Sequence, residues 1–201
     1  MLIQKVLRAT PIISLLTGSL TIGLIVDQRP ALAEQMRCGG MMNHEHHAVA
    51  AGVERKLASY TVPDVTLTDQ NGNRVSLPEL LNSDQPVMLN FIFTSCTAIC
   101  PAMSATFASV QKRLGSDSGK LHMISVSIDP EYDTPDALKA YAERFKAGPQ
   151  WEFLTGSLDD SITVQKAFDA DRGDKMNHAP LTLIRAKRDG QWEKINSDCL
   201  G

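Results

Sequence analysis

The sequence predicts an α/β fold in which a central, mainly parallel β-sheet carries flanking helices and edge hairpins. Three observations support this class. The run 87–93 is almost wholly apolar and rich in branched and aromatic side chains, as in a strand buried on both faces. Short apolar runs alternate along the chain with segments of helical periodicity. Near each end of the folded region, paired strand-like segments surround turn residues and predict hairpins.

The first predicted element is a hairpin. Apolar and polar residues alternate over 65–68 and again over 74–77, on either side of a turn built around Asn71-Gly72. An Asn-Gly pair suits a tight turn because both residues tolerate positive φ. A short helical turn over 78–82 is expected to lead from this hairpin into the central strand.

The central strand is followed at once by two cysteines. Val87–Phe93 is bounded by polar residues, which predicts a buried strand. After Pro101 the apolar residues recur at helical spacing, and proline is well tolerated in the first turn of a helix. Cys96 and Cys100 therefore fall between a buried strand and a helix N-terminus.

The second half of the chain continues the alternation of strands and helices. Residues 121–128 predict another buried strand, and Thr134-Pro135 opens a helix with an N-cap and a proline in its first turn. The remaining elements are a strand over 151–154, a helix capped by Ser157 that runs to about residue 168, and a hairpin of 180–186 with 191–195. This order favours a parallel sheet with helices on both faces.

The composition restricts the classes of function. At 201 residues and 43% hydrophobic content, the chain fits one domain plus an extension and can bury a core without disulfides. A formal net charge of −3 offers no electrostatic basis for nucleic-acid binding. The chain has no glycine-rich phosphate loop, so we expect no nucleotide or other organic cofactor.

Residues 1–33 have the parts of an export signal. Lys5 and Arg8 are basic, an apolar segment covers 11–26, and Ala31-Leu32-Ala33 is a small-residue cleavage site. The segment is either cleaved after Ala33 or retained as a membrane anchor. In both cases the folded domain is expected on the non-cytoplasmic side, either periplasmic or anchored to the membrane.

Residues 34–59 are predicted to be a flexible linker, with the folded domain covering 60–201. Within the linker, residues 36–47 combine Cys38 with three Met and three His in no regular period. Thiol, thioether and imidazole donors together suit copper, so this tract is a candidate copper-loading site. The alternative is a plain linker in which these residues have no role.

The cysteine pair itself indicates reactive sulfur. A helix N-terminus carries partial positive charge, which favours a thiolate over a thiol. The Cys-x-x-x-Cys spacing allows a disulfide that is easily reduced, and the same sulfurs could bind Cu(I). The alternative is two inert structural cysteines.

Three segments together resemble the Sco/SenC family of copper proteins. They are residues 90–101 (NFIFTSCTAICP), residues 125–135 (SVSIDPEYDTP) and His178 ahead of the last hairpin. The resemblance covers roughly residues 61–196 and implies a thioredoxin-like fold. It also implies a role in assembling the copper centre of cytochrome c oxidase, as a metallochaperone, a thiol reductant or both. The implied partner is the copper-bearing oxidase subunit or another copper chaperone, and we expect a monomer.

Carried over residue by residue, the resemblance makes Cys96 and Cys100 the thiolate ligands of copper and His178 the imidazole ligand. Such a set can hold Cu(I) or Cu(II). Asp129 and Asp133 either orient the site loops or only end a strand and cap a turn. His122, in an apolar strand, is expected to be structural.

Two other functions compete with the copper chaperone. In the first, the Cys96/Cys100 pair serves a general thiol-disulfide oxidoreductase or redoxin in which metal is incidental. In the second, the Met/His tract alone buffers or senses copper. Cys199, near the end of the chain, is either free or paired with Cys38.

Overall fold

The computed structural model describes residues 53–188 and 190–196, all within the second of two units of the chain, Cys38–Gly201. The predicted export segment 1–33, the tract 36–47 with Cys38, and Cys199 lie outside the described residues. Among the helices that are described, none has both the length and the apolar character needed to cross a membrane.

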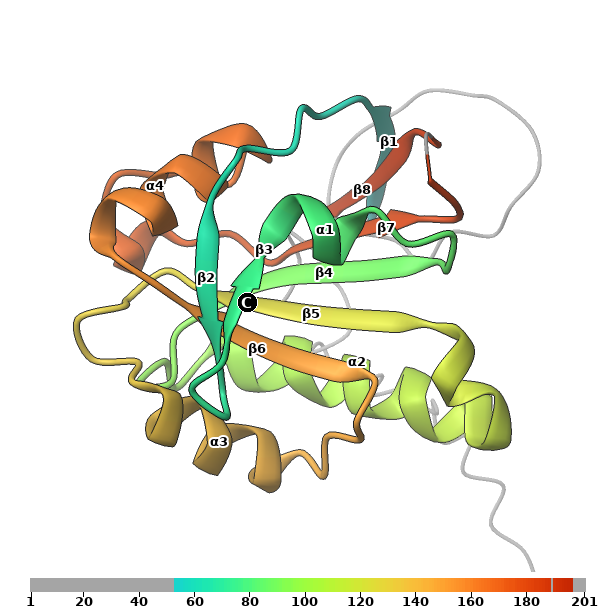
Figure 1. Cartoon of the computed structure of the whole chain (residues 1–201), viewed down its shortest axis with the longest axis horizontal. Coiled ribbons are helices and arrows are strands. Elements are labelled where there is room, and N and C mark those ends of the chain that lie inside the picture. The colour runs from blue at the N-terminus through green and yellow to red at the C-terminus, as the bar shows by residue number, and fades with distance from the viewer. Residues whose placement is uncertain (1–52, 189, 197–201) are drawn as a thin grey trace, which may run out of the picture. The chain divides into compact units, whose positions relative to one another are not determined.

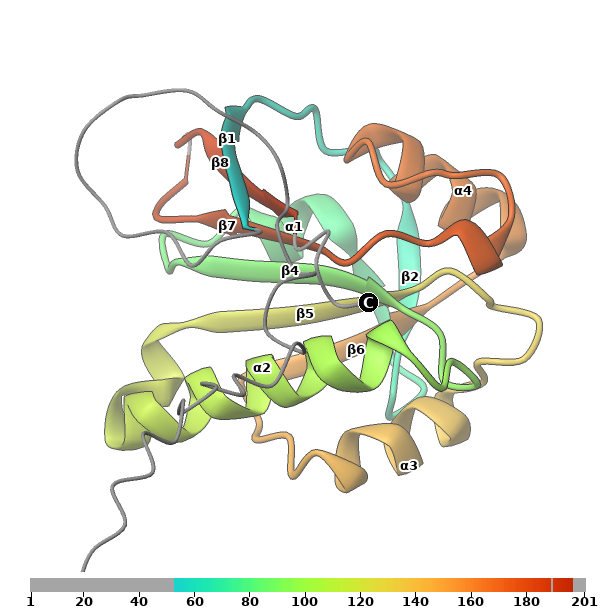
Figure 2. The same cartoon turned by 180° about the vertical axis from the view of Figure 1, so that it is seen from behind.

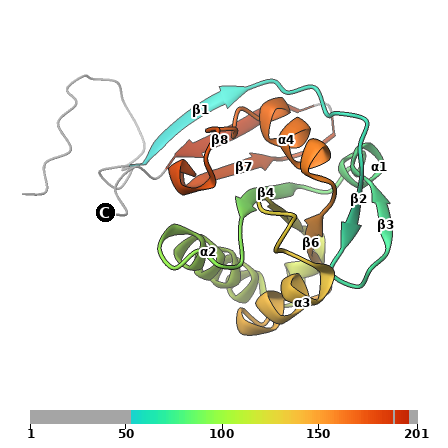
Figure 3. The ribbon, with the colours of Figure 1, turned by 90° about the vertical axis from the view of Figure 1, so that its left-hand side faces the viewer.

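The described residues form an eight-stranded sheet with the strand order β1-β8-β7-β4-β5-β6-β2-β3 (Figure 1). The strands are β1 Glu54–Ala58, β2 Thr66–Asp69, β3 Arg74–Ser76, β4 Val87–Ile92, β5 His122–Ser127, β6 Trp151–Thr155, β7 Leu181–Arg185 and β8 Trp192–Asn196. The α-helices are α1 Leu77–Leu81, α2 Ile99–Leu114, α3 Pro135–Arg144 and α4 Leu158–Ala167, and the 3-10 helices are η1 Gly115–Lys120 and η2 Lys175–Asn177. Helices α2 and α3 cover one face of the sheet, and α4 lies on the other (Figure 3).

The prediction of a mainly parallel sheet is wrong, because the sheet is mixed. Only the β4–β5 and β5–β6 pairs are parallel. The β1–β8, β8–β7, β7–β4, β6–β2 and β2–β3 pairs are antiparallel. Helical crossovers produce the parallel pairs, whereas the two predicted hairpins join the sheet edges in the antiparallel sense. Strand and helix order alone did not reveal how the hairpins attach to the sheet, with β7 antiparallel to β4 and β2 antiparallel to β6.

Strand β1 lies inside the range predicted as a flexible linker, so the ordered fold begins before residue 60. Glu54–Ala58 pairs along its whole length with β8. Its side chains are mostly exposed and follow no apolar alternation, which is why the sequence carried no strand signal. The strand exists because β8 offers a free edge of backbone donors and acceptors.

The remaining predicted elements are confirmed, and β4 lies at the centre of the core. All its side chains are buried. The core aromatic residues include Trp151 and Phe153, whose ring centroids are 4.9 Å apart, and Phe107, 5.4 Å from Trp151. The indole N–H of Trp151 donates to Ser125 Oγ at 2.9 Å, so its polar atom is satisfied inside the core. Fully burying a side chain such as Phe107 or Phe153 stabilises the folded state by about 1.5–3 kcal/mol.

The helix caps fix how the chain enters each helix. Ser76, Thr134 and Ser157 accept backbone N–H groups at the starts of α1, α3 and α4. Helix α2 starts after Ala98 with no side-chain hydrogen bond of this kind from its N-cap residue. Its first N–H groups are therefore available to another acceptor, which proves to be the first cysteine.

Candidate metal and thiol site

The topology brings both cysteines and His178 to one end of β4. The cysteines follow the carboxyl end of β4, in the loop and first turn of α2. His178 precedes β7, which runs antiparallel to β4 with Thr182 opposite Asn90. Because β7 is antiparallel to β4, the residues that precede β7 lie at the same end of the sheet as the residues that follow β4. A parallel β7 would have placed His178 at the opposite end of β4, away from the cysteines.

Cys96 takes the place of a capping side chain for α2. Its backbone N–H donates to the carbonyl of Phe93 at 3.1 Å, which closes the turn after β4. Its Sγ accepts the backbone N–H of Cys100 at 3.4 Å. Both residues are free thiols, Cys96 half-buried and Cys100 buried. The sulfur of Cys96 thus lies at the positive end of the helix.

The two thiols have opposite acidity. Partial burial alone would raise the pKa of Cys96, but the backbone N–H groups at the start of α2 and the Cys100 thiol together lower it. Burial raises the pKa of Cys100 well above its usual range, and the neighbouring Cys96 and Asp133 add to that increase. Cys96 is therefore the thiol that ionises first, and Cys100 is the thiol that keeps its proton to higher pH.

His178 presents a buried nitrogen without a partner. The residue is 8% exposed, and among the described residues its Nε2 has no hydrogen-bond partner. Burial lowers the pKa of the ring, the positive charge of Arg172 lowers it further, and a hydrogen bond with the backbone of Phe91 opposes this. Its ring lies edge-on to Phe93, with centroids 6.4 Å apart. A neutral imidazole with one free nitrogen is the form that binds metals.

Cys96 and His178 line the same cavity, which has a volume of about 310 Å³. Phe93 and Ile99 form apolar parts of its wall, and Met176 also borders it. Within the described ranges, no three His, Cys, Asp or Glu side chains are close enough to hold a metal ion together. The donors fit copper by chemistry, and the imidazole shares a cavity with one of the thiols, but the ligand set is not yet closed around an ion.

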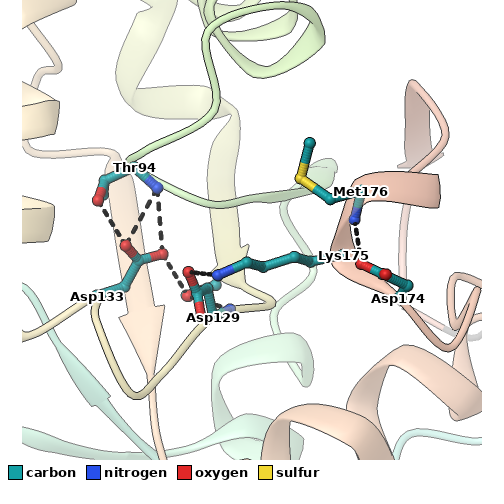
Figure 4. A network of polar contacts seen from close by, with 7 residues as sticks. Thr94, Asp129, Asp133, Asp174, Lys175 and Met176 are labelled. Atoms are coloured by element: carbon teal, nitrogen blue, oxygen red, sulfur yellow. Dashed lines mark hydrogen bonds and ion pairs between the residues drawn. The ribbon is translucent and has the colours of Figure 1, made fainter.

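Asp133 positions the cysteine loop. This fully buried carboxylate accepts the backbone N–H of Thr94 at 3.1 Å and its hydroxyl at 2.5 Å, and it accepts the hydroxyl of Ser127 at 2.6 Å. Figure 4 shows the Thr94 contacts, which join the chain two residues before Cys96 to the loop after β5. Of the two roles expected for Asp133, these contacts support the orienting one.

Asp129 anchors the segment that carries His178. Its buried carboxylate pairs with Lys175 Nζ at 2.6 Å (Figure 4). Its backbone carbonyl also accepts the N–H groups of Tyr132 and Asp133, so it ends β5 and turns the chain as well. The Lys175 ammonium lies 4.8 Å from the ring centroid of Tyr132. The two acidic residues therefore hold the two sides of the cavity, one through Thr94 and the other through Lys175.

His122 lies away from this site, as expected for a structural residue. Its Nε2 contacts Glu152 Oε1 across the β5–β6 pair at 3.0 Å. Sequence reasoning missed Thr94, Lys175 and Met176. The one available signal was the run Lys175-Met176-Asn177-His178, in which a thioether stands two residues from the candidate imidazole.

Comparison with known proteins identifies the relatives of the chain. The SCO1/SenC family model matches residues 53–186. A SCO1 protein homolog of Bacillus subtilis is 38% identical over 99 residues, which are 49% of this chain and 50% of that protein. The chain therefore aligns with half of the length of this relative.

Two solved structures extend the comparison. BsSco, described as a member of the Sco family of cytochrome c oxidase assembly proteins with a disulfide switch, is 32% identical. The match covers 72% of this chain and 87% of BsSco, with a TM-score of 0.60. ScoI of Bradyrhizobium japonicum, solved with copper bound, is 30% identical over 63% of this chain and 83% of that chain, with a TM-score of 0.54. The expected Sco-type, thioredoxin-like fold is confirmed, apart from the mixed sheet. With the family model covering more than half of its length, the chain belongs to the SCO1/SenC family.

Proposed function

We propose that this protein is an exported copper metallochaperone that serves the assembly of the copper centre of cytochrome c oxidase. Copper is its cargo, bound by the thiolates of Cys96 and Cys100 and the imidazole of His178. The observation that carries the proposal is the buried Nε2 of His178, which lacks a partner among the described residues in a cavity shared with Cys96. A buried polar atom without a partner costs about 1–3 kcal/mol, and a bound cation would relieve that cost.

The asymmetry of the donors supports cargo in either oxidation state. Two thiolates suffice for Cu(I), and the imidazole adds a nitrogen donor suited to Cu(II). Binding requires the proton of Cys100 to leave, which the charge of the ion makes favourable. Because no three-ligand group is closed among the described residues, the ligand side chains would have to come closer together when copper binds.

The test is a copper titration of the reduced full-length protein and three variants, C96S, C100S and H178A. We expect one Cu(I) per wild-type chain in the thiolate site, lost in C96S and C100S. We expect Cu(II) binding with a sulfur-to-copper charge-transfer band, lost in H178A. H122A serves as the matched histidine control and should bind like the wild type. Retention of the band in H178A would refute the assignment of His178.

A second candidate function is thiol-disulfide reduction, favoured by the opposite acidity of the two thiols. In that reaction the Cys96 thiolate attacks a disulfide of the substrate, forming a mixed disulfide and releasing one substrate thiolate, which takes a proton. Cys100 then loses its proton and attacks Cys96 Sγ, which releases the second substrate thiolate and leaves a Cys96–Cys100 disulfide. Two electrons pass from the protein to the substrate.

The two functions are separated by His178. A pure reductase needs only the sulfurs, so H178A would reduce a disulfide substrate as fast as the wild type while failing to bind Cu(II). The reductant role would become the main one if wild-type protein bound no copper in the reduced state.

The cellular setting forms part of the proposal. Residues 1–33 would export the domain, which then acts in the periplasm or stays anchored to the membrane, and the tract 36–47 would load copper. The partner would be the copper-bearing oxidase subunit or another copper chaperone, met by a monomer. N-terminal sequencing of the mature protein distinguishes cleavage after Ala33 from retention of the anchor.

A further inference from the structure

A methionine borders the cavity of Cys96 and His178. Met176 is 75% exposed and lies in η2, two residues before His178. Met176 lines the same cavity as His178. Single exposed apolar side chains are common on proteins and need no explanation by themselves. The position of Met176 beside a thiol and an unpartnered imidazole nitrogen gives this one a chemical meaning.

Two polar contacts hold the segment that carries Met176. The Met176 N–H donates to Asp174 Oδ1 at 2.8 Å. Lys175 is held by Asp129 at 2.6 Å. Figure 4 shows the Met176 side chain extending away from the Asp174 carboxylate. These two contacts hold the backbone beside Met176, so less backbone freedom is lost when its side chain binds an ion.

The charge near the thioether also permits a cation. Lys175 is a positive group on the cavity wall, but the Asp129 carboxylate at 2.6 Å offsets its charge. The Lys175 ammonium also faces the rings of Tyr132 and Phe93, at 4.8 and 5.8 Å from their centroids. Copper would therefore meet sulfur and nitrogen donors without a net opposing charge from this lysine.

The sulfur donors form a gradient of exposure. Met176 is the outermost at 75%, Cys96 is half-buried, and Cys100 is fully buried. Thioethers are soft, neutral ligands that favour Cu(I), whereas Cu(II) favours nitrogen and oxygen donors. We propose that Met176 is an additional ligand at the mouth of the site, which receives Cu(I) first and raises the affinity for Cu(I) without raising that for Cu(II). This inference rests on the proposed function, which leaves Met176 without a role.

The test compares M176L with the wild type in the full-length, reduced protein. Leucine keeps the size and apolar character of the side chain and removes the sulfur. Cu(I) affinity is measured by competition with a chromophoric Cu(I) chelator, at no more than one equivalent of metal. We expect M176L to bind Cu(I) about tenfold more weakly, a loss in the range seen for groups that support metal ligands. Cu(II) binding should be unchanged.

M103L is the matched control, because Met103 is a buried methionine of α2 that does not line the cavity. It should bind Cu(I) like the wild type. As a direct readout, the methyl group of Met176, labelled with 13C and assigned by its absence in M176L, should shift when Cu(I) is added. An unshifted methyl signal, or an equal loss of Cu(I) and Cu(II) affinity in M176L, would overturn the role of Met176.

The outcomes separate this inference from the proposed function. If C96S and C100S lose Cu(I) while M176L keeps full affinity, the chaperone stands and the thioether ligand is wrong. If C96S and C100S still bind Cu(I) as the wild type does, the proposed cysteine site itself fails.

Discussion

Each sulfur of the cysteine pair takes its character from where it lies relative to α2. Cys96 lies just before the helix and accepts the N–H of Cys100, whereas Cys100 lies inside the first turn and is fully buried. A thiolate is stabilised by hydrogen-bond donors and destabilised by burial, so two cysteines four positions apart have pKa values shifted in opposite directions. The pair is thus built with one accessible nucleophile and one protected partner.

This asymmetry predicts unequal alkylation of the reduced, metal-free protein. At neutral pH iodoacetamide should modify Cys96 well before Cys100, because the pKa of Cys96 is lowered and that of Cys100 is raised. The rate at Cys96 should rise through an apparent pKa below the ordinary thiol value. Peptide mass spectrometry over time and pH measures both sites separately. Equal rates, or faster reaction at Cys100, would contradict the assignment.

The buried imidazole predicts a pH-dependent loss of stability. Burial lowers the pKa of His178 in the folded state, so the folded protein binds fewer protons than the unfolded chain in the window between the two pKa values. The stability that the neutral ring contributes is fully present above the pKa of His178 in the unfolded chain, about 6.5, and is lost as the pH falls toward and through its pKa in the folded protein. Each unit by which folding lowers the pKa of His178 corresponds to about 1.4 kcal/mol of the free energy of unfolding.

Urea unfolding of metal-free protein from pH 7.5 to 5 checks this expectation. H178Q should lose less stability over that range than the wild type, whatever its stability at pH 7.5. H122Q is the control, since His122 contacts Glu152 outside the cavity. Identical slopes for wild type and H178Q would show that the ring is not held neutral.

At the scale of elements, the site is held by the loops that leave β4 and β5. Their parallel pairing places Ile92 beside Ser127, so the two loops emerge together. The carboxylate of Asp133 then joins them through Thr94 and Ser127. The turn that carries Cys96 is therefore set by a residue nearly forty positions later, as well as by the helix that follows it.

Replacing Asp133 with alanine should destabilise the fold and disturb the cysteines together. It leaves the hydroxyl of Ser127 and the N–H of Thr94 without their acceptor, at a cost of about 1–3 kcal/mol for the buried hydroxyl and less for the part-buried N–H. We expect a lower urea midpoint and weaker Cu(I) binding in the protein that remains folded. E131A is the control, because Glu131 is an exposed carboxylate in the same loop. A D133A variant as stable as E131A would rule out this connection.

At the scale of the whole molecule, the mixed sheet depends on strands added at its edges. Strand β1 covers β8, whose other neighbour is β7 (Figure 2). The β7–β8 hairpin in turn presents His178 to the end of β4. An uncovered β8 would expose a row of backbone donors and acceptors that other chains can pair with.

Truncation tests the role of β1. A protein starting at Val53 keeps the strand and should remain monodisperse, whereas one starting at Ser59 exposes the edge of β8. We expect the shorter protein to self-associate at concentrations where the longer one does not, and to unfold at lower urea. Light scattering and urea titration measure the two effects. The same size and stability for both proteins would show that β1 is dispensable.

Much of the fold was predictable because its signals are local. The apolar run of β4, the caps Thr134 and Ser157 and the turn at Gly72 each report on a few neighbouring residues, and each was confirmed. The edge strand β1 was not predictable, since its side chains are exposed and its hydrogen bonds depend on β8. The same limit applies to Thr94 and Lys175, whose roles arise from contacts with Asp133 and Asp129, which are distant in sequence.

By itself the sequence determined the cysteine pair at a strand–helix junction and the order of the elements, because spacing, periodicity and capping act over a few residues. Only the tertiary structure decided that β7 runs against β4. That direction, set by long-range backbone pairing, brings His178 and Met176 into the cavity of Cys96.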